Sequence, residues 1–134
     1  RIVEFSAAGQ GVVQDDGDDF PDWLEILHED EESYSLTDHY LTNDPDALSL
    51  WKIPRGTTLK SGQRWVVYAS GKDRTNIFQN AVHSNFTLEK SRGYLALVAP
   101  DGEKILSEWR DYPSQRPGIS YGEDDGGALA TLLR

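Results

Sequence analysis

The densest group of side chains that could bind or react is the acidic stretch Asp15–Asp22, which reads Asp-Asp-Gly-Asp-Asp-Phe-Pro-Asp. Hard cations such as Ca²⁺ take about six to eight oxygen ligands, and clustered carboxylates on a loop can supply them. The stretch departs from the EF-hand pattern, because its third residue is Gly17 and Ile26 stands at the twelfth position. One interpretation is a calcium site of another kind, formed by four carboxylates: Asp15, Asp16, Asp18 and Asp19. The simpler interpretation is a solvated acidic turn in which Asp side chains cap backbone amides.

Other catalytic or metal-binding patterns find little support in the sequence. The three histidines, His28, His39 and His83, are scattered, and none belongs to a His-Glu-x-x-His zinc motif. Gly71-Lys72 lacks the flanking residues of a phosphate-binding loop. The chain has no Cys, which excludes thiolate ligands, thiol catalysis and disulfides. We predict that the domain is not an enzyme. If the acidic stretch forms a calcium site, calcium is the one cofactor that we expect.

Four tryptophans suggest an alternative function, because flat aromatic faces can stack on sugar rings. Trp23, Trp51 and Trp65 lie in expected strands, where a β-sandwich buries its aromatic side chains. Trp109 follows the last expected hairpin strand, and we expect it to be exposed. The alternative is therefore a carbohydrate-binding module with a calcium-stabilised acidic loop and a polysaccharide partner. It predicts at least two Trp or Tyr side chains in one solvent-facing row.

Short runs of alternating apolar and polar residues, separated by turn residues, indicate the elements that position these groups. Ile2–Phe5 is typical of a short edge strand. Arg64–Ser70 and Gly93–Val98 are apolar on both faces, so we expect each to be a buried central strand. Pro100–Gly102 is a turn signal that predicts a hairpin into Glu103–Glu108.

Three further strands are expected at Trp23–His28, Tyr40–Thr42 and Trp51–Ile53. In the first of these, Leu24 and Ile26 share one face. Regular short strands with turns between them predict an all-β fold, a β-sandwich of two mostly antiparallel sheets with about seven to nine strands. We expect one domain over residues 1–126, followed at 127–134 by a C-terminal tail that is a helix, an added strand or the start of a linker.

The charge is distributed unevenly along the chain. The formal net charge is −10, and the span Asp15–Asp46 holds 13 acidic residues and no Lys or Arg. Nucleic-acid binding depends on neutralising phosphates, so the overall sign argues against that class of partner. No stretch approaches the roughly 20 apolar residues of a membrane-spanning helix, and we expect no membrane insertion.

Several segments together, in this order along the chain, resemble one known family. They are Asp15–Glu25 (DDGDDFPDWLE), Tyr40–Asp46 (YLTNDPD), Trp51–Thr57 (WKIPRGT), Leu59–Arg74 (LKSGQRWVVYASGKDR), His83–Phe86 (HSNF), Gly93–Gly102 (GYLALVAPDG) and Pro113–Gly122 (PSQRPGISYG). The family is that of the lamin tail domains, and the bacterial branch is the closer likeness. The loop at His28–Ser33 departs from the family pattern, which expects Asn or Pro in a turn there.

The resemblance implies an immunoglobulin-like sandwich that serves as an accessory or interaction domain. In the bacterial branch such domains stand beside other domains of exported or cell-surface proteins, so the resemblance implies an extracellular or surface location. It implies protein contacts, either with an unknown partner protein or with other domains of the parent chain. It implies no catalytic residues.

Overall fold

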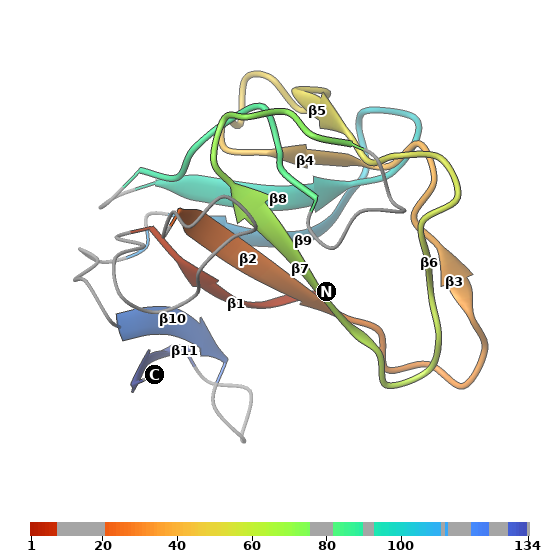
Figure 1. Cartoon of the computed structure of the whole chain (residues 1–134), viewed down its shortest axis with the longest axis horizontal. Coiled ribbons are helices and arrows are strands. Elements are labelled where there is room, and N and C mark those ends of the chain that lie inside the picture. Colours follow the sequence, from red (N-terminus) through yellow and green to blue (C-terminus); the bar gives the residue numbers. More distant parts are fainter. Residues whose placement is uncertain are drawn as a thin grey trace.

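The structure is a computed structural model of the 134-residue chain. It describes residues 1–7, 21–75, 82–89, 93–110, 112, 119–123 and 129–133. These residues form eleven strands and no helix (Figure 1). The all-β class predicted from the alternating pattern is confirmed. In the described ranges, no helix has the length and apolar character needed to cross a membrane.

Two larger antiparallel sheets form the two layers of a β-sandwich, and a third, two-stranded sheet lies beside them (Figure 1). The first sheet has five strands in this spatial order: β11 (Leu129–Leu133), β10 (Ile119–Glu123), β1 (Ile2–Ser6), β2 (Asp22–Leu27) and β7 (Arg64–Ala69). The second sheet has four: β5 (Trp51–Lys52), β4 (Tyr40–Thr42), β8 (Tyr94–Val98) and β9 (Ile105–Arg110). The third sheet pairs β3 (Tyr34–Ser35) with β6 (Thr58–Leu59).

The core lies between the two larger sheets and consists of inward-facing side chains of their strands together with side chains of connecting segments, such as Leu36, Ile53 and Phe86. Leu24 and Ile26 of β2 share the inner face, as their spacing predicted, and pack in one cluster with Leu95 and Leu97 of β8. Burying such a side chain fully contributes about 1.5–3 kcal/mol. The alternation of β2 therefore explains why it forms a strand and which side chains face the core, although Trp23 and Glu25 on its other face are buried as well.

The expectation that Ile2–Phe5 is an edge strand was wrong. β1 lies between β10 and β2, and a register shift between Ile2 and Glu4 lets both Ile2 and Phe5 reach the core. A Cβ atom on Gly122 of β10 would lie 2.3 Å from the carbonyl oxygen of Val3, so only glycine allows this close approach. The partner of β1 comes from more than 100 residues away in the chain, which a local pattern does not reveal.

β7 forms as predicted, but it is the outer strand of its sheet and only Val67 and Ala69 are buried, so its predicted buried, central position was wrong. The backbone of Tyr68 nevertheless has partners on the outer side. Its N–H donates to the carbonyl of Val82 at 3.0 Å, and its carbonyl accepts from the N–H of Ser84 at 2.9 Å. A short following segment thus protects part of this edge, which explains how an apolar strand can stand at the outside of a sheet.

β8 is buried along its whole length, as predicted. Its inner side chains face the core, and its outer ones pack in a second cluster, which consists of Tyr40, Leu48, Tyr94, Ala96, Val98 and Ile105. The hairpin after β8 is also confirmed, but β9 begins two residues later than expected. The reason is the turn itself, because the carboxylate of Asp101 accepts from the N–H groups of Glu103 and Lys104 at 2.8 and 2.9 Å. These two bonds lower the pKa of Asp101.

The C-terminal residues contribute to the sandwich. Of the three conformations expected for the tail at 127–134, the structure has the added strand, since β11 pairs with β10 over its full length. The backbone of β11 is therefore part of the five-stranded sheet.

Candidate functional site

One end of the sandwich holds a pocket of about 160 Å³, which is lined by residues from the end of β2 and from the β3–β6 sheet. Figure 1 shows the β3–β6 sheet beside the two larger sheets. The floor is apolar and comes from four side chains that are themselves buried: Ile26, Leu36, Leu59 and Leu97. These residues belong to segments that are distant in sequence. The pocket is thus a product of the sandwich packing.

Two exposed apolar side chains flank this floor. Tyr34 of β3 is 43% exposed and Leu106 of β9 is 38% exposed, and both line the pocket. Among the side chains that the structure describes, these two are the large hydrophobic ones that face solvent. Single exposed apolar side chains are common, but two beside one apolar pocket indicate a binding surface.

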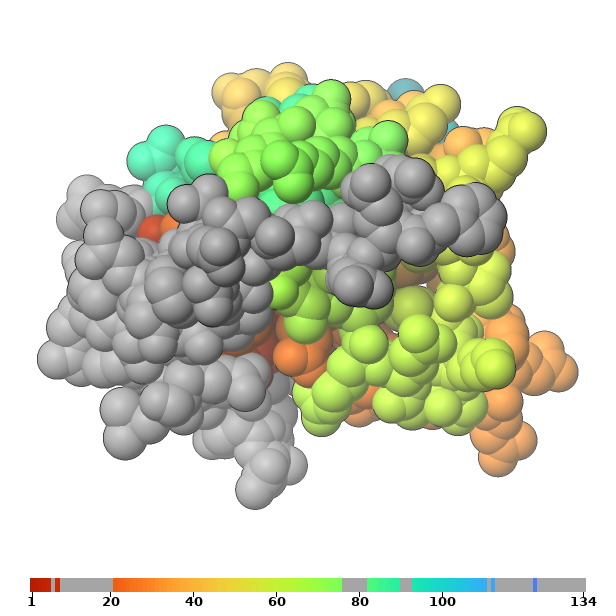
Figure 2. Space-filling view, viewed as in Figure 1, coloured from red at the N-terminus to blue at the C-terminus, as the bar shows by residue number. Residues whose placement is uncertain are grey.

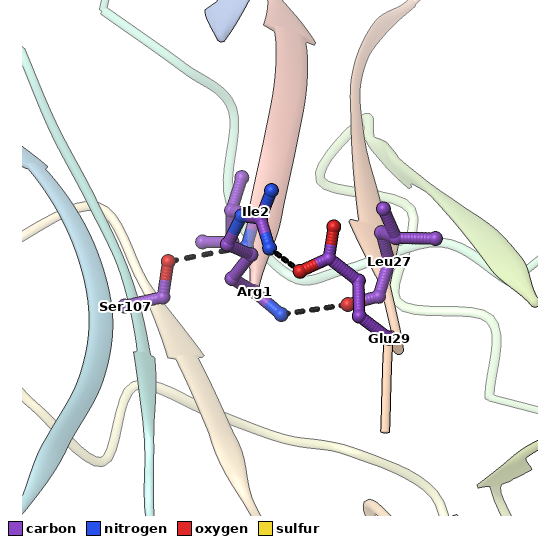
Figure 3. A network of polar contacts seen from close by, with 5 residues as sticks. All are labelled: Arg1, Ile2, Leu27, Glu29 and Ser107. Carbon is purple, nitrogen blue, oxygen red and sulfur yellow. Dashed lines mark hydrogen bonds and ion pairs between the residues drawn. The ribbon is translucent and has the colours of Figure 1, made fainter. Parts of the chain in front are cut away.

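Short polar contacts hold the walls of the pocket together (Figure 3). The backbone nitrogen of Arg1 donates to the carbonyl of Leu27 at 2.8 Å, and the guanidinium of Arg1 pairs with the carboxylate of Glu29. The N–H of Ile2 donates to Oγ of Ser107 at 3.1 Å. The start of β1 therefore connects β2 in one sheet with β9 in the other, directly beside the pocket.

An aromatic ladder forms one side of the rim. The ring of Tyr34 lies between His28 and His39, at centroid distances of 5.9 and 5.5 Å. Nε2 of His39 lies 2.9 Å from the Tyr34 hydroxyl, and its Nδ1 lies 3.2 Å from the carbonyl of Thr37. A carbonyl can only accept, so Nδ1–H donates to it, and whenever the ring is neutral Nε2 accepts from the tyrosine hydroxyl. His28 Nε2 contacts the carbonyl of Glu32, which fixes the other outer ring.

The loop after β2 brings negative charge to the same rim. Glu29, Asp30, Glu31 and Glu32 are all exposed, and Asp30 is part of the pocket lining. In Figure 2 this part of the chain, in orange, lies at the right-hand edge next to residues near 60, in yellow-green. The two segments are neighbours because β3 pairs with β6.

The size of the pocket limits what it can hold. A cavity of about 150 Å³ lined by Leu, Ile and Phe accommodates a benzene-sized group. Sites for drug-sized molecules are about 300–1,000 Å³. The pocket here therefore fits one side chain of the size of Leu, Ile or Phe rather than a cofactor or an oligosaccharide.

The pocket contains a histidine and a carboxylate, His28 and Asp30, which an enzyme hypothesis requires. A general base must lie within hydrogen-bond reach of its proton donor and needs an orienting partner. In the described residues, the polar contact of the His28 ring is to the backbone carbonyl of Glu32, and no bond joins it to Asp30. The floor offers no polar group to a reacting atom. The geometry thus favours apolar binding over acid–base chemistry.

A second pair of residues has atoms suited to nucleophilic chemistry, but its surroundings do not suit a substrate. Oγ of Ser70 lies 2.8 Å from Nδ1 of His83. His83 is completely buried, and Ser70 Oγ also accepts from the N–H of Lys72 at 3.1 Å. His83 stacks on Tyr68 at 5.2 Å. The pair therefore holds the segment after β7 against the edge of that strand.

The sequence also contains Gly-Ile-Ser-Tyr-Gly at 118–122, which has the spacing of a hydrolase nucleophile elbow. That motif requires a sharp turn from a strand into a helix. Ser120 instead lies inside β10 and pairs with Leu132 of β11. The described backbone of the motif, from Ile119 on, thus forms a strand and not that turn.

The proposed calcium ligands Asp15, Asp16, Asp18 and Asp19 lie outside the described residues, so the calcium site stays a prediction from the sequence. In the part of the chain that is described, no three His, Asp or Glu side chains gather closely enough to hold a metal ion. Asp22, at the end of the same acidic stretch, begins β2, and its carboxylate accepts from the N–H of Leu88 at 2.9 Å.

The expectation that Trp109 is exposed was wrong. Its indole N–H donates to the carbonyl of Ile2 at 3.0 Å, and its ring packs edge-on against Phe5 at 5.5 Å. Trp23 and Trp51 are buried, as expected, whereas Trp65 is only partly buried and packs against the core. Among the side chains described, Tyr34 is the one large aromatic group that is exposed, so no row of two supports the carbohydrate alternative there.

The sequence offered only a weak signal for the pocket. Leu36 and Leu59 lie in or beside strands of two residues, which are too short to show a period. Leu106 lies in an expected strand, but its exposure depends on which face of β9 meets the core. The exposed acidic run before Tyr34 was the one visible feature of the site.

Comparison of the chain with protein-family models, with curated proteins and with solved structures finds no match. The likeness to the lamin tail domain family therefore rests on the segments described above.

Proposed function

We propose that this chain is a non-catalytic interaction domain, which contacts a partner protein by taking one apolar side chain of that partner into the pocket. The observation that carries the proposal is the position of Tyr34 and Leu106, both exposed and both beside the apolar floor. Hydrophobic anchors that enter a preformed pocket dominate the energy of many protein interfaces.

The architecture and the sequence resemblance support a wider setting for this role. An immunoglobulin-like fold of the lamin tail kind would make the chain an accessory domain of a larger, exported or cell-surface protein. The two-layered sandwich agrees with such a fold at the level of its layers. The immunoglobulin-like topology, the exported location and the absence of catalysis are parts of the proposal.

The test is a nuclear magnetic resonance titration of leucine methyl groups with two short peptides. One peptide is Gly-Ser-Leu-Ser-Gly, and the other has Ala in place of Leu. Full burial of one leucine side chain contributes about 1.5–3 kcal/mol, so we expect weak binding, about millimolar or weaker. The leucine peptide should shift the methyl signals of Leu36, Leu59, Leu97 and Leu106, while Leu95 in the closed core stays unchanged.

Two matched variants show whether the pocket itself binds. Leu106→Lys places a charged side chain beside the apolar floor and should abolish the shifts of the other pocket methyl groups. Glu103→Lys adds the same side chain at an exposed position on the same hairpin, outside the pocket lining, and should leave them intact. Equal shifts with the alanine peptide, or unchanged binding in Leu106→Lys, would show that the pocket does not accept an anchor side chain.

A further inference from the structure

The rim of the pocket carries more negative charge than its own contacts neutralise. Glu29, Asp30, Glu31 and Glu32 are all exposed. Arg1 pairs with Glu29, whereas the ion pairs of the described residues involve none of the other three acids. Three carboxylates therefore stand in solvent next to an apolar pocket.

We infer that the pocket binds an extended, basic segment of a partner protein, in which Lys or Arg side chains flank a leucine-sized anchor. This inference rests on the proposed function. In an extended segment, residues two positions apart are separated by about 7 Å, so side chains near the anchor can reach the rim while the anchor occupies the floor. Opposite charges at a rim steer association and select among partners more than they add affinity.

Charge decides between this partner and two others. A second copy of the chain would bring a net charge of −10 and the same acidic rim. A nucleic acid would bring phosphates to three carboxylates, although protein–nucleic acid affinity depends on neutralising phosphate charge. A basic polypeptide segment alone satisfies both the apolar floor and the acidic rim.

The probes are three heptapeptides with blocked ends, added to the whole chain with labelled leucine methyl groups. They are Lys-Lys-Ser-Leu-Ser-Lys-Lys, the same peptide with Glu for each Lys, and the lysine peptide with Ala for Leu. The lysine–leucine peptide should shift the methyl signals of Leu36, Leu59, Leu97 and Leu106. At low ionic strength it should bind about threefold to tenfold more tightly than the glutamate peptide, because exposed ion pairs each add little. About 0.5 M salt should remove that difference.

A variant in which three acids of the rim are replaced by their amides tests the role of the rim charge. Asp30→Asn combined with Glu31→Gln and Glu32→Gln should remove the preference for lysine and keep the binding of leucine. Glu103→Gln removes one exposed acid outside the pocket and should keep the preference.

The outcomes separate the inference from the proposed function. Equal binding of the glutamate and lysine peptides would overturn the basic partner and leave the anchor pocket in place. If the lysine peptide with Ala for Leu causes the same shifts, both the basic partner and the anchor pocket are overturned. The same holds if neither leucine-containing peptide shifts the pocket signals. Pocket signals that move with protein concentration, with no peptide present, would identify a second copy as the occupant and overturn the inference.

Discussion

The two ends of the sandwich core are closed in different ways. At one end, which we call the aromatic end, the ring of Phe5 packs against Trp109 at 5.5 Å and against Tyr112 at 4.7 Å. The polar tip of each outer ring bonds a backbone carbonyl, Trp109 to Ile2 and Tyr112 to Glu89. At this end the polar tips of Trp109 and Tyr112 are therefore both bonded to the backbone.

At the other end, the pocket end, aliphatic side chains take the place of the rings. Leu36, Leu59 and Leu97 are buried but leave a pocket of about 160 Å³ between them. Tyr34 and Leu106 lie at its margin and remain exposed. The hydroxyl of Tyr34 bonds to His39, which is not part of the pocket lining.

The difference between the two ends indicates that the aromatic end serves mainly the stability of the fold and the pocket end mainly binding. Aromatic rings with polar tips fill the first end completely, and interiors packed in this way tolerate little change. The second end leaves an apolar surface exposed, which folding alone would favour burying. Changes at the aromatic end should therefore act on the free energy of unfolding, and changes at the pocket end on binding.

Truncation of Trp109 should produce the largest loss of stability. Trp109→Ala removes a buried ring and leaves the carbonyl of Ile2 without its indole donor, so we expect a loss of about 3–5 kcal/mol in the free energy of unfolding. Chemical denaturation measures this value. Trp109→Phe keeps an aromatic ring, so its loss in the free energy of unfolding should be clearly smaller. A loss below about 1 kcal/mol for the alanine variant would mean that the aromatic end does not dominate stability.

Addition of a single methyl group at Gly93 should be the next most harmful change. A Cβ atom there would lie 2.2 Å from the Tyr112 hydroxyl, so Gly93→Ala should lower the free energy of unfolding by about 1–3 kcal/mol. Tyr112→Phe would leave the ring carbon Cζ 2.5 Å from the added Cβ atom, so the matching background is Tyr112→Ala, in which the ring is absent and alanine at position 93 should be better tolerated. Simple additivity of the two changes in a double-mutant cycle would argue against this contact.

Alkaline pH should act on the aromatic end through Tyr112. Burial raises the pKa of its hydroxyl above the usual value of 10.0, and the nearby carboxylates of Asp22 and Glu89 add to this effect. The unfolded chain then loses this proton before the folded one does, so stability should be complete below about pH 10 and fall as pH rises further. Urea denaturation between pH 8 and pH 11 measures the slope, and Tyr112→Phe should make it shallower. An identical slope in that variant would assign the effect to other groups.

Removal of the Tyr34 hydroxyl should have a moderate effect on stability and a visible effect on the rim. Tyr34→Phe eliminates the bond to His39, for which we expect a loss of about 0.5–1.5 kcal/mol. The ring signals of His39 in a proton spectrum should shift, while the signals of the distant Trp109 stay in place. If His39 does not respond, the hydroxyl does not hold the ladder together.

A change at Leu106 should have the smallest effect on folding and the largest on binding. Leu106→Ser alters an exposed side chain, so thermal unfolding should show a change of about 0.5 kcal/mol or less. Binding of the leucine peptides described above should nevertheless be lost. A loss of stability comparable to that of Trp109→Ala would mean that the two ends do not differ in function.

Local patterns in the sequence predicted individual strands better than their arrangement. The alternation in β2 correctly placed Leu24 and Ile26 on one face, and the continuous apolar run of β8 correctly predicted burial on both sides. β7 shows the same kind of run but lies at the outside of its sheet, because the segment at Val82–Ser84 replaces a full partner strand. A run of apolar residues thus predicted a strand in both cases, but it did not predict how deeply the strand is buried, since β7 is only partly buried.

The candidate site could be predicted only in part for a similar reason. The acidic loop at 29–32 was recognisable because charge exposes a segment wherever it lies. The pocket beside it was not recognisable, since Leu59 and Leu106 are 47 positions apart in the sequence and meet only through the sandwich. The inward position of Trp109 was missed because the acceptor for its indole, the carbonyl of Ile2, lies at the other end of the chain.

The sequence by itself determined the all-β class, the strands with clear alternation, the turn at Pro100–Gly102 and the exposed acidic rim. These features depend on the local geometry of strands and turns, which extends over a few neighbouring residues. The tertiary structure alone decided the central place of β1, the outer place of β7, and the contrast between the aromatic end and the pocket end. These depend on which distant segments pair and which faces meet, because packing is a property of surfaces brought together by the whole chain.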